Sequence, residues 1–428
     1  METKVIFRYP LGNPKRKYRQ DRLVISTFNA NMSNLRRGLE LCRELGFNTV
    51  EFAWVKPYDS LRCITACEEV GIDGIFQNWD VYGGFQETRG GAPIDGEKLA
   101  AYVGFTRKFR HFAGYYVWDE PLSTEKIRDA AAQVAAVEKA DPGRLPFTVA
   151  IPSYNRTKTW KNGLFEGYLR EYTETISPAV LSLDFYPFWN KKEVTPEAQL
   201  DGSELFLDIG LLRELSLEHG IPMWFYFQTQ DDPGKYIYRK LTPAQVRVQQ
   251  YNALMYGAVG LQNYNVYNGA LTSDGSRGPL FFSTKELNSR SYQLGKTLTA
   301  LRSEAVFHSP ELLRGRVEFD RFRRPLSDSG ILADGELPFR ISAGEFSDSE
   351  GNRYLFVLNR DYELAAGFVL ALKKNFRVYE VSKEDGMQRV LNDGTDMLRL
   401  SLQPGDAVLL RFQDAAEQPF LIDYVLKK

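Results

Sequence analysis

Up to about residue 310, the chain repeats one pattern of hydrophobic and polar positions. An amphipathic segment ends in a glycine, and a short apolar run begins within a few residues. The clearest examples are Gly46 before 49–54, Gly71 before 74–79, Gly220 before 222–227 and Gly257 before 259–264. A glycine just past a helix takes the left-handed cap conformation, and a buried strand follows a short loop. The pattern predicts alternating helices and strands.

The predicted strands are continuous apolar runs, which is typical of a parallel sheet covered on both faces. Eight such runs begin near Val24, Thr49, Ile72, Ala113, Pro146, Val180, Pro222 and Val259. Their mean spacing of about 34 residues is close to the ~30 residues of a strand–helix–strand unit. We therefore predict a (β/α)8 TIM barrel whose last helix covers 283–302. A doubly wound open sheet is disfavoured because it needs no eighth unit and usually carries a glycine-rich ligand loop.

After residue 310 the helical spacing disappears. Short strand-like runs follow, at 340–341, 354–358, 368–370, 377–379 and 407–410. Turn-forming residues at 392–394 and 404–406 separate the later runs. This part is expected to form an antiparallel β-sandwich. The predicted domains are a catalytic barrel over 1–310 and an accessory sandwich over 311–428.

Charge and composition exclude several classes of protein. The 54 Lys and Arg residues nearly balance the 55 Asp and Glu residues, so no basic surface for nucleic acid is expected. The longest apolar runs are about five residues, far short of the ~18 that a membrane span needs. Three cysteines and three histidines form no metal-binding or nucleophile motif. We expect no cofactor and no metal. The first residues show no signal-peptide pattern, which leaves the compartment open.

The fourth strand tip carries the strongest chemical signal. The active site of a TIM barrel lies at the C-terminal ends of its strands. Here the sequence from 114 to 121 places Asp119 and Glu120 side by side after aromatic residues and before Pro121. Both carboxyl groups are expected at the mouth of the barrel, with Pro121 holding Glu120 extended. The structural alternative is an acidic first turn that favours the dipole of the next helix.

Other strand tips add carboxyl, amide and aromatic side chains. Asp184 interrupts the apolar sixth strand, where a buried charge needs a partner or a purpose. Asp231 and Asp232 follow the seventh tip. Amides and acids bind hydroxyl groups and flat rings cover pyranose faces, whereas a phosphate site would carry cations. The predicted substrate-binding residues are Asn29, Trp54, Gln77, Asn78, Trp79, Trp118, Tyr186, Tyr226, Gln228, Gln230, Gln262, Asn263 and Tyr264.

The sequence Trp118-Asp119-Glu120-Pro121 resembles the motif of TIM-barrel glycoside hydrolases. In their large retaining clan an Asn-Glu-Pro-like motif on strand four supplies the general acid/base, a role that the resemblance implies for Glu120. Asp119 replaces the asparagine of that motif. Gln228 and Gln230 stand where the clan carries its nucleophilic glutamate on strand seven.

An adjacent Asp-Glu pair on strand four is also similar to substrate-assisted hexosaminidases, including the family 123 type. There the 2-acetamido oxygen of the substrate is the nucleophile. The resemblance implies that Asp119 orients this group and that Glu120 protonates the leaving oxygen. A third possibility pairs Glu120 with Asp184. A carboxyl separation of about 5–5.5 Å would then indicate retention, and about 6.5–9.5 Å inversion.

The predicted function is a glycoside hydrolase that acts on an oligosaccharide or glycoside with a neutral or 2-acetamido sugar. The catalytic candidates are Glu120, Asp119 and Asp184. One alternative is a non-catalytic carbohydrate-binding barrel that lacks the strand-seven nucleophile. A lyase or isomerase is a weaker alternative, because it would need a metal or a lysine base, and Lys56 is the one lysine close to a strand tip. Neither nucleic acid nor a membrane is an expected partner.

Overall fold

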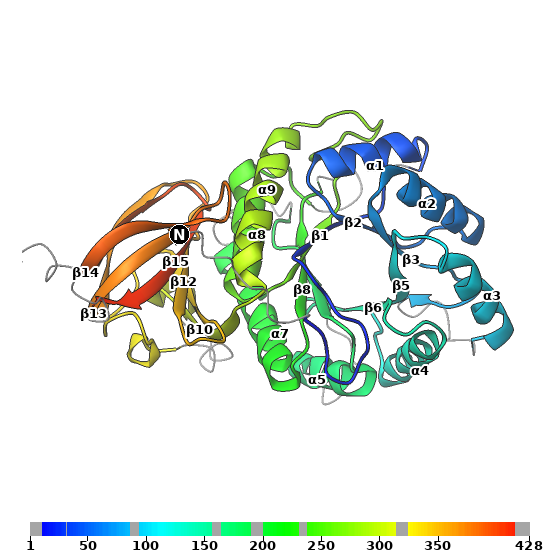
Figure 1. Ribbon diagram of the computed structural model, residues 1–428, viewed down its shortest axis with the longest axis horizontal. Helices are drawn as coiled ribbons and strands as arrows, with labels where there is room; N and C mark the ends of the chain where they lie inside the picture. The colour runs from blue at the N-terminus through cyan, green and yellow to red at the C-terminus, as the bar shows by residue number, and fades with distance from the viewer. Residues whose placement is uncertain are drawn as a thin grey trace, which may run out of the picture.

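The chain folds into a parallel barrel followed by an antiparallel sheet (Figure 1). The computed structural model describes residues 11–30, 32–85, 94–155, 164–189, 200–230, 238–313 and 324–415. The strands of the barrel are β1 (Val24–Phe28), β2 (Thr49–Phe52), β3 (Asp73–Phe76), β5 (Phe112–Asp119), β6 (Leu145–Ala150), β7 (Leu181–Phe185), β8 (Met223–Gln228) and β9 (Gly260–Tyr264). Pairing of β3 with β5 closes the barrel, and each strand begins within one residue of its predicted start. The predicted (β/α)8 barrel is confirmed.

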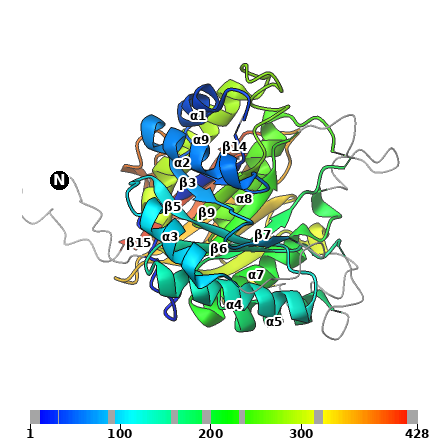
Figure 2. The ribbon, with the colours of Figure 1, turned by 90° about the vertical axis from the view of Figure 1, so that its right-hand side faces the viewer.

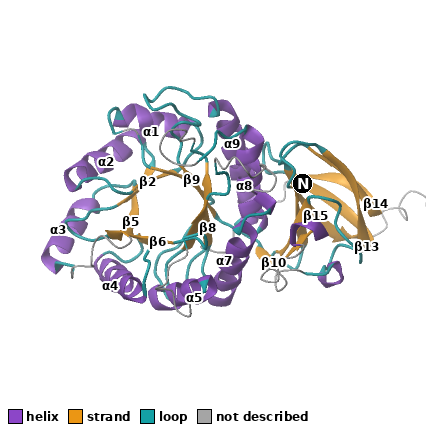
Figure 3. Cartoon of the chain, turned by 180° about the vertical axis from the view of Figure 1, so that it is seen from behind, coloured by secondary structure: helices purple, strands orange, loops and turns teal. Residues whose placement is uncertain are grey.

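Helices surround the barrel (Figure 3). They are α1 (Leu35–Glu44), α2 (Pro57–Val70), α3 (Gly96–Thr106), α4 (Thr124–Ala140), α5 (Phe165–Ile176), α7 (Leu205–His219), α8 (Pro243–Met255) and α9 (Phe281–Leu298). Figure 2 shows α4 and α5 packed side by side along the barrel wall. The four glycines that predicted helix ends all have positive φ. Among the described residues, no helix is long and apolar enough to cross a membrane.

Two apolar clusters build the barrel. One fills its interior with large rings such as Phe147 and Trp224, and the other lies between the strands and the helices. Helix α9 ends at Leu298, four residues before the predicted end of the last helix. The chain turns there because strand β10 (Arg302–His308) joins the C-terminal sheet, where its backbone pairs with β11 (Ile341–Ser347).

The C-terminal sheet contains six antiparallel strands in the order β10-β11-β12-β15-β13-β14. The remaining strands are β12 (Arg353–Asn359), β13 (Ala366–Val381), β14 (Gln388–Leu402) and β15 (Ala407–Asp414). Helix α8 packs against β12, and the other face of the sheet forms a second core. The open end of the β13–β14 hairpin, where β13 begins and β14 ends, joins this second core. Apolar side chains therefore pack in layers as in a sandwich.

The expected C-terminal antiparallel domain is confirmed, with one internal correction. Residues 392–394, which were predicted to turn, lie inside β14, where the pairing register with β13 shifts. Because the pairing is irregular here, the turn-forming residues distort the strand locally, and the chain does not reverse its direction. The predicted turn at 404–406 does separate β14 from β15. The domain boundary near residue 310 stays a prediction. Strand β10, which lies before that residue, already belongs to the sheet.

Candidate active site

A β-bulge near the end of β5 decides where its last side chains point. Tyr116 is opposite Phe147 on β6, but Trp118 is opposite the very next residue, Thr148, so β5 holds one extra residue. An extra residue reverses the alternation of side chains after it. Tyr116 therefore points into the barrel, Trp118 packs in the outer cluster, and Asp119 reaches the mouth of the barrel.

The carboxyl group of Asp119 is held by two donors. Trp54 Nε1 donates to Oδ2 at 3.0 Å, and the Tyr116 hydroxyl donates to Oδ1 at 3.1 Å. Trp54 is itself oriented by a bond from its backbone N–H to Gln77 Oε1 at 2.8 Å. Burial and the neighbouring Glu120 raise the pKa of Asp119 well above its usual value, although the two hydrogen bonds oppose the rise. Asp119 is thus fixed in place by two hydrogen bonds, and the neighbouring Glu120 disfavours its ionisation.

Glu120 lines the same mouth in an uncommon backbone conformation. Its φ is +50°, so the expectation that Pro121 holds it extended is wrong. The backbone turns left-handed directly after its N–H pairs with the carbonyl oxygen of Val149 on β6. Left-handed φ values in residues other than glycine cluster at functional sites. Helix α4 begins only at Thr124 with Ser123 as its cap, so neither acid belongs to its first turn.

Asp184 faces Asp119 and Glu120 from β7. It is 7% exposed, and its Oδ1 accepts no hydrogen bond from the described residues. Its strand partner on β8 is Tyr226, whose hydroxyl also has no hydrogen-bond partner in the described structure. Burial, then the charges of Glu120 and Asp119, raise the pKa of Asp184 well above its usual value. The predicted salt-bridge alternative for Asp184 lacks a cation, since no described residue forms an ion pair with it.

A cavity of about 300 Å³ contains all three carboxyl groups. Its described lining is aromatic and acidic and includes no Lys, Arg or His. The residues are Phe28, Trp54, Tyr116, Asp119, Glu120, Val149, Tyr154, Asn155, Asp184, Tyr186, Trp189, Tyr226, Tyr238 and Tyr264. The rings brace one another: Tyr186 stacks on Tyr264 with centroids 4.8 Å apart, and Phe28 meets Trp54 edge-on at 5.3 Å. Such a wall offers several flat apolar surfaces beside groups that bind hydroxyls.

The structure brings seven of the predicted residues into this cavity. They are Asp119, Glu120, Asp184, Trp54, Tyr186, Tyr226 and Tyr264. Gln77 stands behind them and orients Trp54. Asp231 and Asp232 lie outside the described residues, so their predicted contribution stays open.

Other predicted residues are occupied elsewhere. Trp118 packs against Gly84 on the outside of the barrel. The Gln228 side chain both accepts from and donates to the backbone of Phe188, which ties the β7 loop to β8. Gln230 binds Asn265. The remaining five lie at strand ends or inside the barrel without lining the cavity, namely Asn29, Asn78, Trp79, Gln262 and Asn263.

Sequence reasoning missed seven lining residues and one buried acid. Only closure of the barrel reveals that the seven converge on the cavity, namely Phe28, Tyr116, Val149, Tyr154, Asn155, Trp189 and Tyr238. Glu51 lies inside the barrel with Gln262, which was predicted to bind substrate directly. Glu51 could have been identified from the sequence, because it is a carboxylate inside an apolar strand, the same signal that selected Asp184.

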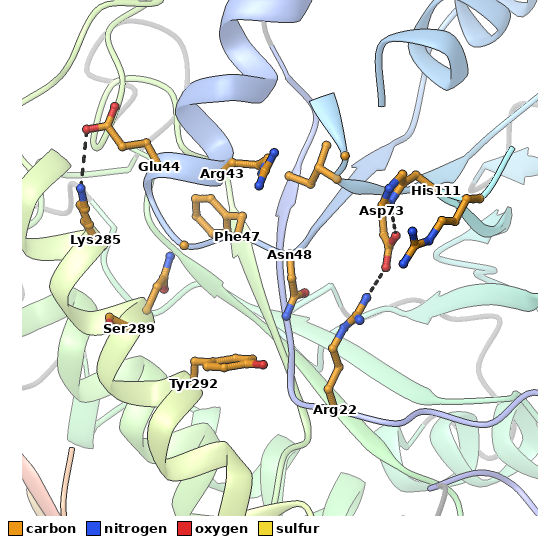
Figure 4. A pocket seen from close by; sticks show the side chains of 15 residues that line it. Arg22, Arg43, Glu44, Phe47, Asn48, Asp73, His111, Lys285, Ser289 and Tyr292 are labelled. Atoms are coloured by element: carbon orange, nitrogen blue, oxygen red, sulfur yellow. Dashed lines mark hydrogen bonds and ion pairs between the residues drawn. The ribbon is translucent and has the colours of Figure 1, made fainter. Parts of the chain in front are cut away.

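A larger cavity of about 670 Å³ lies at the opposite, N-terminal end of the barrel (Figure 4). Most of its charges have structural partners: Asp73 pairs with Arg22 and His111, and Lys285 pairs with Glu44. Arg43 donates to the carbonyl oxygen of Val70 at the end of α2. Cations at this end of the barrel are stabilised by the negative ends of the helix dipoles. This surface therefore has a structural explanation, and the aromatic cavity remains the candidate site.

The described residues contain no group of three or more His, Cys, Asp or Glu side chains arranged to hold a metal ion. The three carboxyl groups of the aromatic cavity come from two strand tips and neighbour rings, hydroxyls and one another. Such an arrangement can place a proton donor and a carboxylate beside a bound ligand.

Comparison with known proteins identifies relatives in fold only. No protein-family model and no curated protein matches the sequence. A protein of Bacteroides fragilis assigned as an alpha-galactosidase has a TM-score of 0.52 at 11% identity, over 92% of this chain and 81% of its own. A GH27 β-L-arabinopyranosidase of Geobacillus stearothermophilus has a TM-score of 0.51 at 9% identity, over 93% and 98%. The alpha-galactosidase I of Mortierella vinacea has a TM-score of 0.50 at 10% identity, over 92% and 98%.

The predicted resemblance to TIM-barrel glycoside hydrolases is confirmed at the level of the fold. The chain shares with them a barrel followed by a C-terminal β-domain. The resemblance to family 123 and the role of the strand-four motif stay predictions.

Proposed function

We propose that the chain is a glycoside hydrolase that cleaves the bond to a neutral or 2-acetamido sugar, with Glu120 as general acid/base. One observation carries the proposal: Asp119, Glu120 and Asp184 share one aromatic cavity at the C-terminal end of the barrel. Glycosidic cleavage needs two carboxyl groups in different protonation states. The fold shared with glycoside hydrolases supports the same conclusion.

The second carboxyl group distinguishes two mechanisms. Asp119, held by Trp54 and Tyr116, is suited to orient a 2-acetamido group in a substrate-assisted reaction. Asp184, which lines the same cavity and whose Oδ1 accepts no hydrogen bond from the described residues, is suited to act opposite Glu120 as nucleophile or base. In both mechanisms the burial and mutual proximity of the acids favour the protonated form of at least one of them.

Two alternatives have less support. A binding-only barrel would gain support if Asp184, Asp231 and Asp232 all lay far from Glu120 and no acetamido pocket existed, but Asp184 and Glu120 line the same cavity. A lyase or isomerase that uses Lys56 would need this lysine in the site. Lys56 lies over the ring of Tyr58 and is not part of the described cavity lining.

The test is a panel of aryl glycosides, with and without a 2-acetamido group, assayed on the wild type and on three isosteric variants. Glu120→Gln, Asp119→Asn and Asp184→Asn each remove one acid. Loss of general acid or nucleophilic catalysis typically lowers kcat/KM by about 10²–10⁴-fold. Glu125→Gln is the matched control, because Glu125 is an exposed acid at the start of α4, only five residues from Glu120.

Each outcome selects one mechanism. Turnover confined to 2-acetamido sugars and lost in Asp119→Asn would support the substrate-assisted reaction. Turnover of plain glycosides lost in Asp184→Asn would support the Glu120–Asp184 pair. If no glycoside is turned over but sugars raise the melting temperature, the protein binds sugar without cleaving it, and the proposal is wrong.

A further inference from the structure

Glu51 is a buried acid that the proposed reaction does not use. It lies on β2 inside the barrel and is 0% exposed. Its Oε1 accepts hydrogen bonds from Ser26 Oγ at 2.5 Å and from Gln262 Nε2 at 2.8 Å. Its Oε2 has no hydrogen-bond partner among the described residues. An acid here is unusual, because branched apolar side chains usually fill the interior of such barrels.

The hydrogen bonds of Glu51 connect four strands beneath the catalytic cavity. Ser26 belongs to β1 and Gln262 to β9, and Gln262 Oε1 in turn accepts from Ser182 Oγ on β7 at 2.6 Å. All of these partners are neutral. No described Lys, Arg or His forms an ion pair with Glu51, so a negative charge on it is not neutralised locally.

The same acid is close to the groups that hold Asp119. Trp54, whose indole N–H binds Asp119, follows Glu51 by three residues, just past the end of β2. Tyr116, the other donor to Asp119, also senses the charge of Glu51. The groups that face Glu51 are therefore Ser26 from β1, Gln262 from β9, and Tyr116 and Asp119 from β5.

We propose that Glu51 is a positioning residue that raises the pH at which Asp119 is ionised. Burial and the neighbouring Glu120 already disfavour ionisation of Asp119. When Glu51 is a carboxylate, its uncompensated charge adds to both effects, and when Glu51 is a neutral acid, this contribution is absent. The inference rests on the proposed function for its catalytic consequence, but the coupling of the two acids exists with or without turnover.

Burial raises the pKa of Glu51 to about 7, against the opposing hydrogen bonds of Ser26 and Gln262. The charge of Glu51 therefore changes in the neutral range. A group with a raised folded-state pKa favours folding most at low pH. Its contribution declines as the pH rises above the unfolded-state value near ~4.3 and levels off above the folded-state value.

The first measurement is the melting temperature from pH 4 to pH 9, for the wild type and Glu51→Gln. We expect the difference between variant and wild type to grow in favour of the variant up to about pH 7 and then to stay constant. Ser26→Ala keeps Glu51 but removes a hydrogen bond that stabilises its carboxylate. The pH range over which Glu51 changes the stability should therefore extend to higher pH in this variant. A pH-independent difference in both variants would overturn the inference.

A double-mutant cycle tests the coupling to Asp119 without any activity. Glu51→Gln is compared in the wild-type and Asp119→Asn backgrounds at pH 8. We expect its gain in melting temperature to be smaller in Asp119→Asn, because position 119 then carries no ionisable group whose proton loss the charge of Glu51 could oppose. Additive effects would contradict the coupling and would leave the proposed function intact.

The catalytic consequence is measured last. In Glu51→Gln the limb of the kcat/KM profile that reports Asp119 should move to lower pH by about 0.5–1 unit, the size expected for removal of a nearby like charge. Ser182→Ala, which changes the same network without removing a charge, should leave the position of the limb unchanged. If no glycoside is turned over, the proposed function fails while the two stability measurements still decide the coupling.

Discussion

At the scale of single residues, the site depends on how Asp119 is held. Trp54 has φ of +57° and Asn29 has φ of +58°, and with Glu120 they place left-handed backbone after three barrel strands. Strained backbone of this kind costs on the order of 1–3 kcal/mol for each residue. At Trp54 the strained conformation directs the indole N–H onto Asp119.

The indole N–H of Trp54 is predicted to contribute to the reaction rather than to stability. Trp54→Phe keeps an aromatic ring in the cavity but removes the donor to Asp119. A hydrogen bond to a charged group is worth about 1.5–3 kcal/mol, so we expect kcat/KM to fall by about 10–100-fold. The melting temperature should change little, because Trp54 is 43% exposed. Unchanged kcat/KM would show that the bond has no role in the reaction.

The raised carboxyl pKa values predict a particular pH dependence. A general acid works while it is protonated, so a raised pKa moves the loss of activity to higher pH. Burial and like charges raise the pKa values of Asp119 and Asp184. Because these two acids share the cavity with Glu120, the proposed general acid, we expect the group of three to lose its last proton, and kcat/KM to decline, at a pH well above ~4, where ordinary carboxyl groups titrate. A flat profile from about pH 4 to pH 8 would contradict this expectation.

At the scale of elements, the end of β5 depends on a two-residue strand. Strand β4 (Gly84–Phe85) pairs with Trp118 and Asp119 just after the bulge. A Cβ atom on Gly84 would lie 2.4 Å from the Trp118 ring, so the tryptophan occupies the space that a side chain would need. Glycine at this position thus supports the outward packing of Trp118 and the inward direction of Asp119.

Gly84→Ala is therefore predicted to destabilise the protein. Overpacking of this kind costs about 1–3 kcal/mol, which chemical denaturation can measure. Gly104→Ala is the matched control, because a Cβ atom there meets nothing within 4 Å and the residue is exposed on α3. The control should be neutral or slightly stabilising, since alanine favours a helix over glycine by about 1 kcal/mol. Equal effects of the two substitutions would argue against the packing explanation.

At the scale of the whole molecule, a buried arginine joins the C-terminal sheet to the barrel. Arg360 follows β12 and is fully buried. Its guanidinium pairs with Asp201, which precedes α7 of the barrel, at 2.6 Å, and with Glu311 at 2.9 Å. With burial, the nearby guanidinium lowers the pKa of His308 well below its usual value, so this histidine is neutral.

Arg360→Met should weaken the attachment of the two parts. Removal of one partner from a buried ion pair costs about 3–5 kcal/mol, because the remaining charges stay buried without compensation. Arg290→Met is the comparison: Arg290 on α9 also reaches the C-terminal sheet, at Glu384, but this pair is exposed. Exposed pairs contribute at most about 1 kcal/mol. Arg360→Met should therefore lose more unfolding free energy than Arg290→Met. A similar loss in both variants would contradict the distinction between the buried and the exposed ion pair.

The pattern along the chain was sufficient for the fold. Continuous apolar runs and glycine-terminated helices are local consequences of burial on both faces and of helix capping, so strand starts were predicted to within one residue. The acid pair at 119–120 was also visible, because it interrupts an aromatic strand. At 392–394 the same reasoning failed, since pairing with β13 outweighed the local preference for a turn.

The local pattern of residues was enough to predict the barrel, the order of its elements and the acids at two strand tips. Long-range packing was needed to show that Asp184 shares a cavity with Asp119, that Trp118 points outward and that Glu51 lies beneath the site. The physical reason is that side-chain direction at a strand end depends on a bulge, and proximity depends on barrel closure. Both arise from packing between residues distant in the chain, which no local periodicity records.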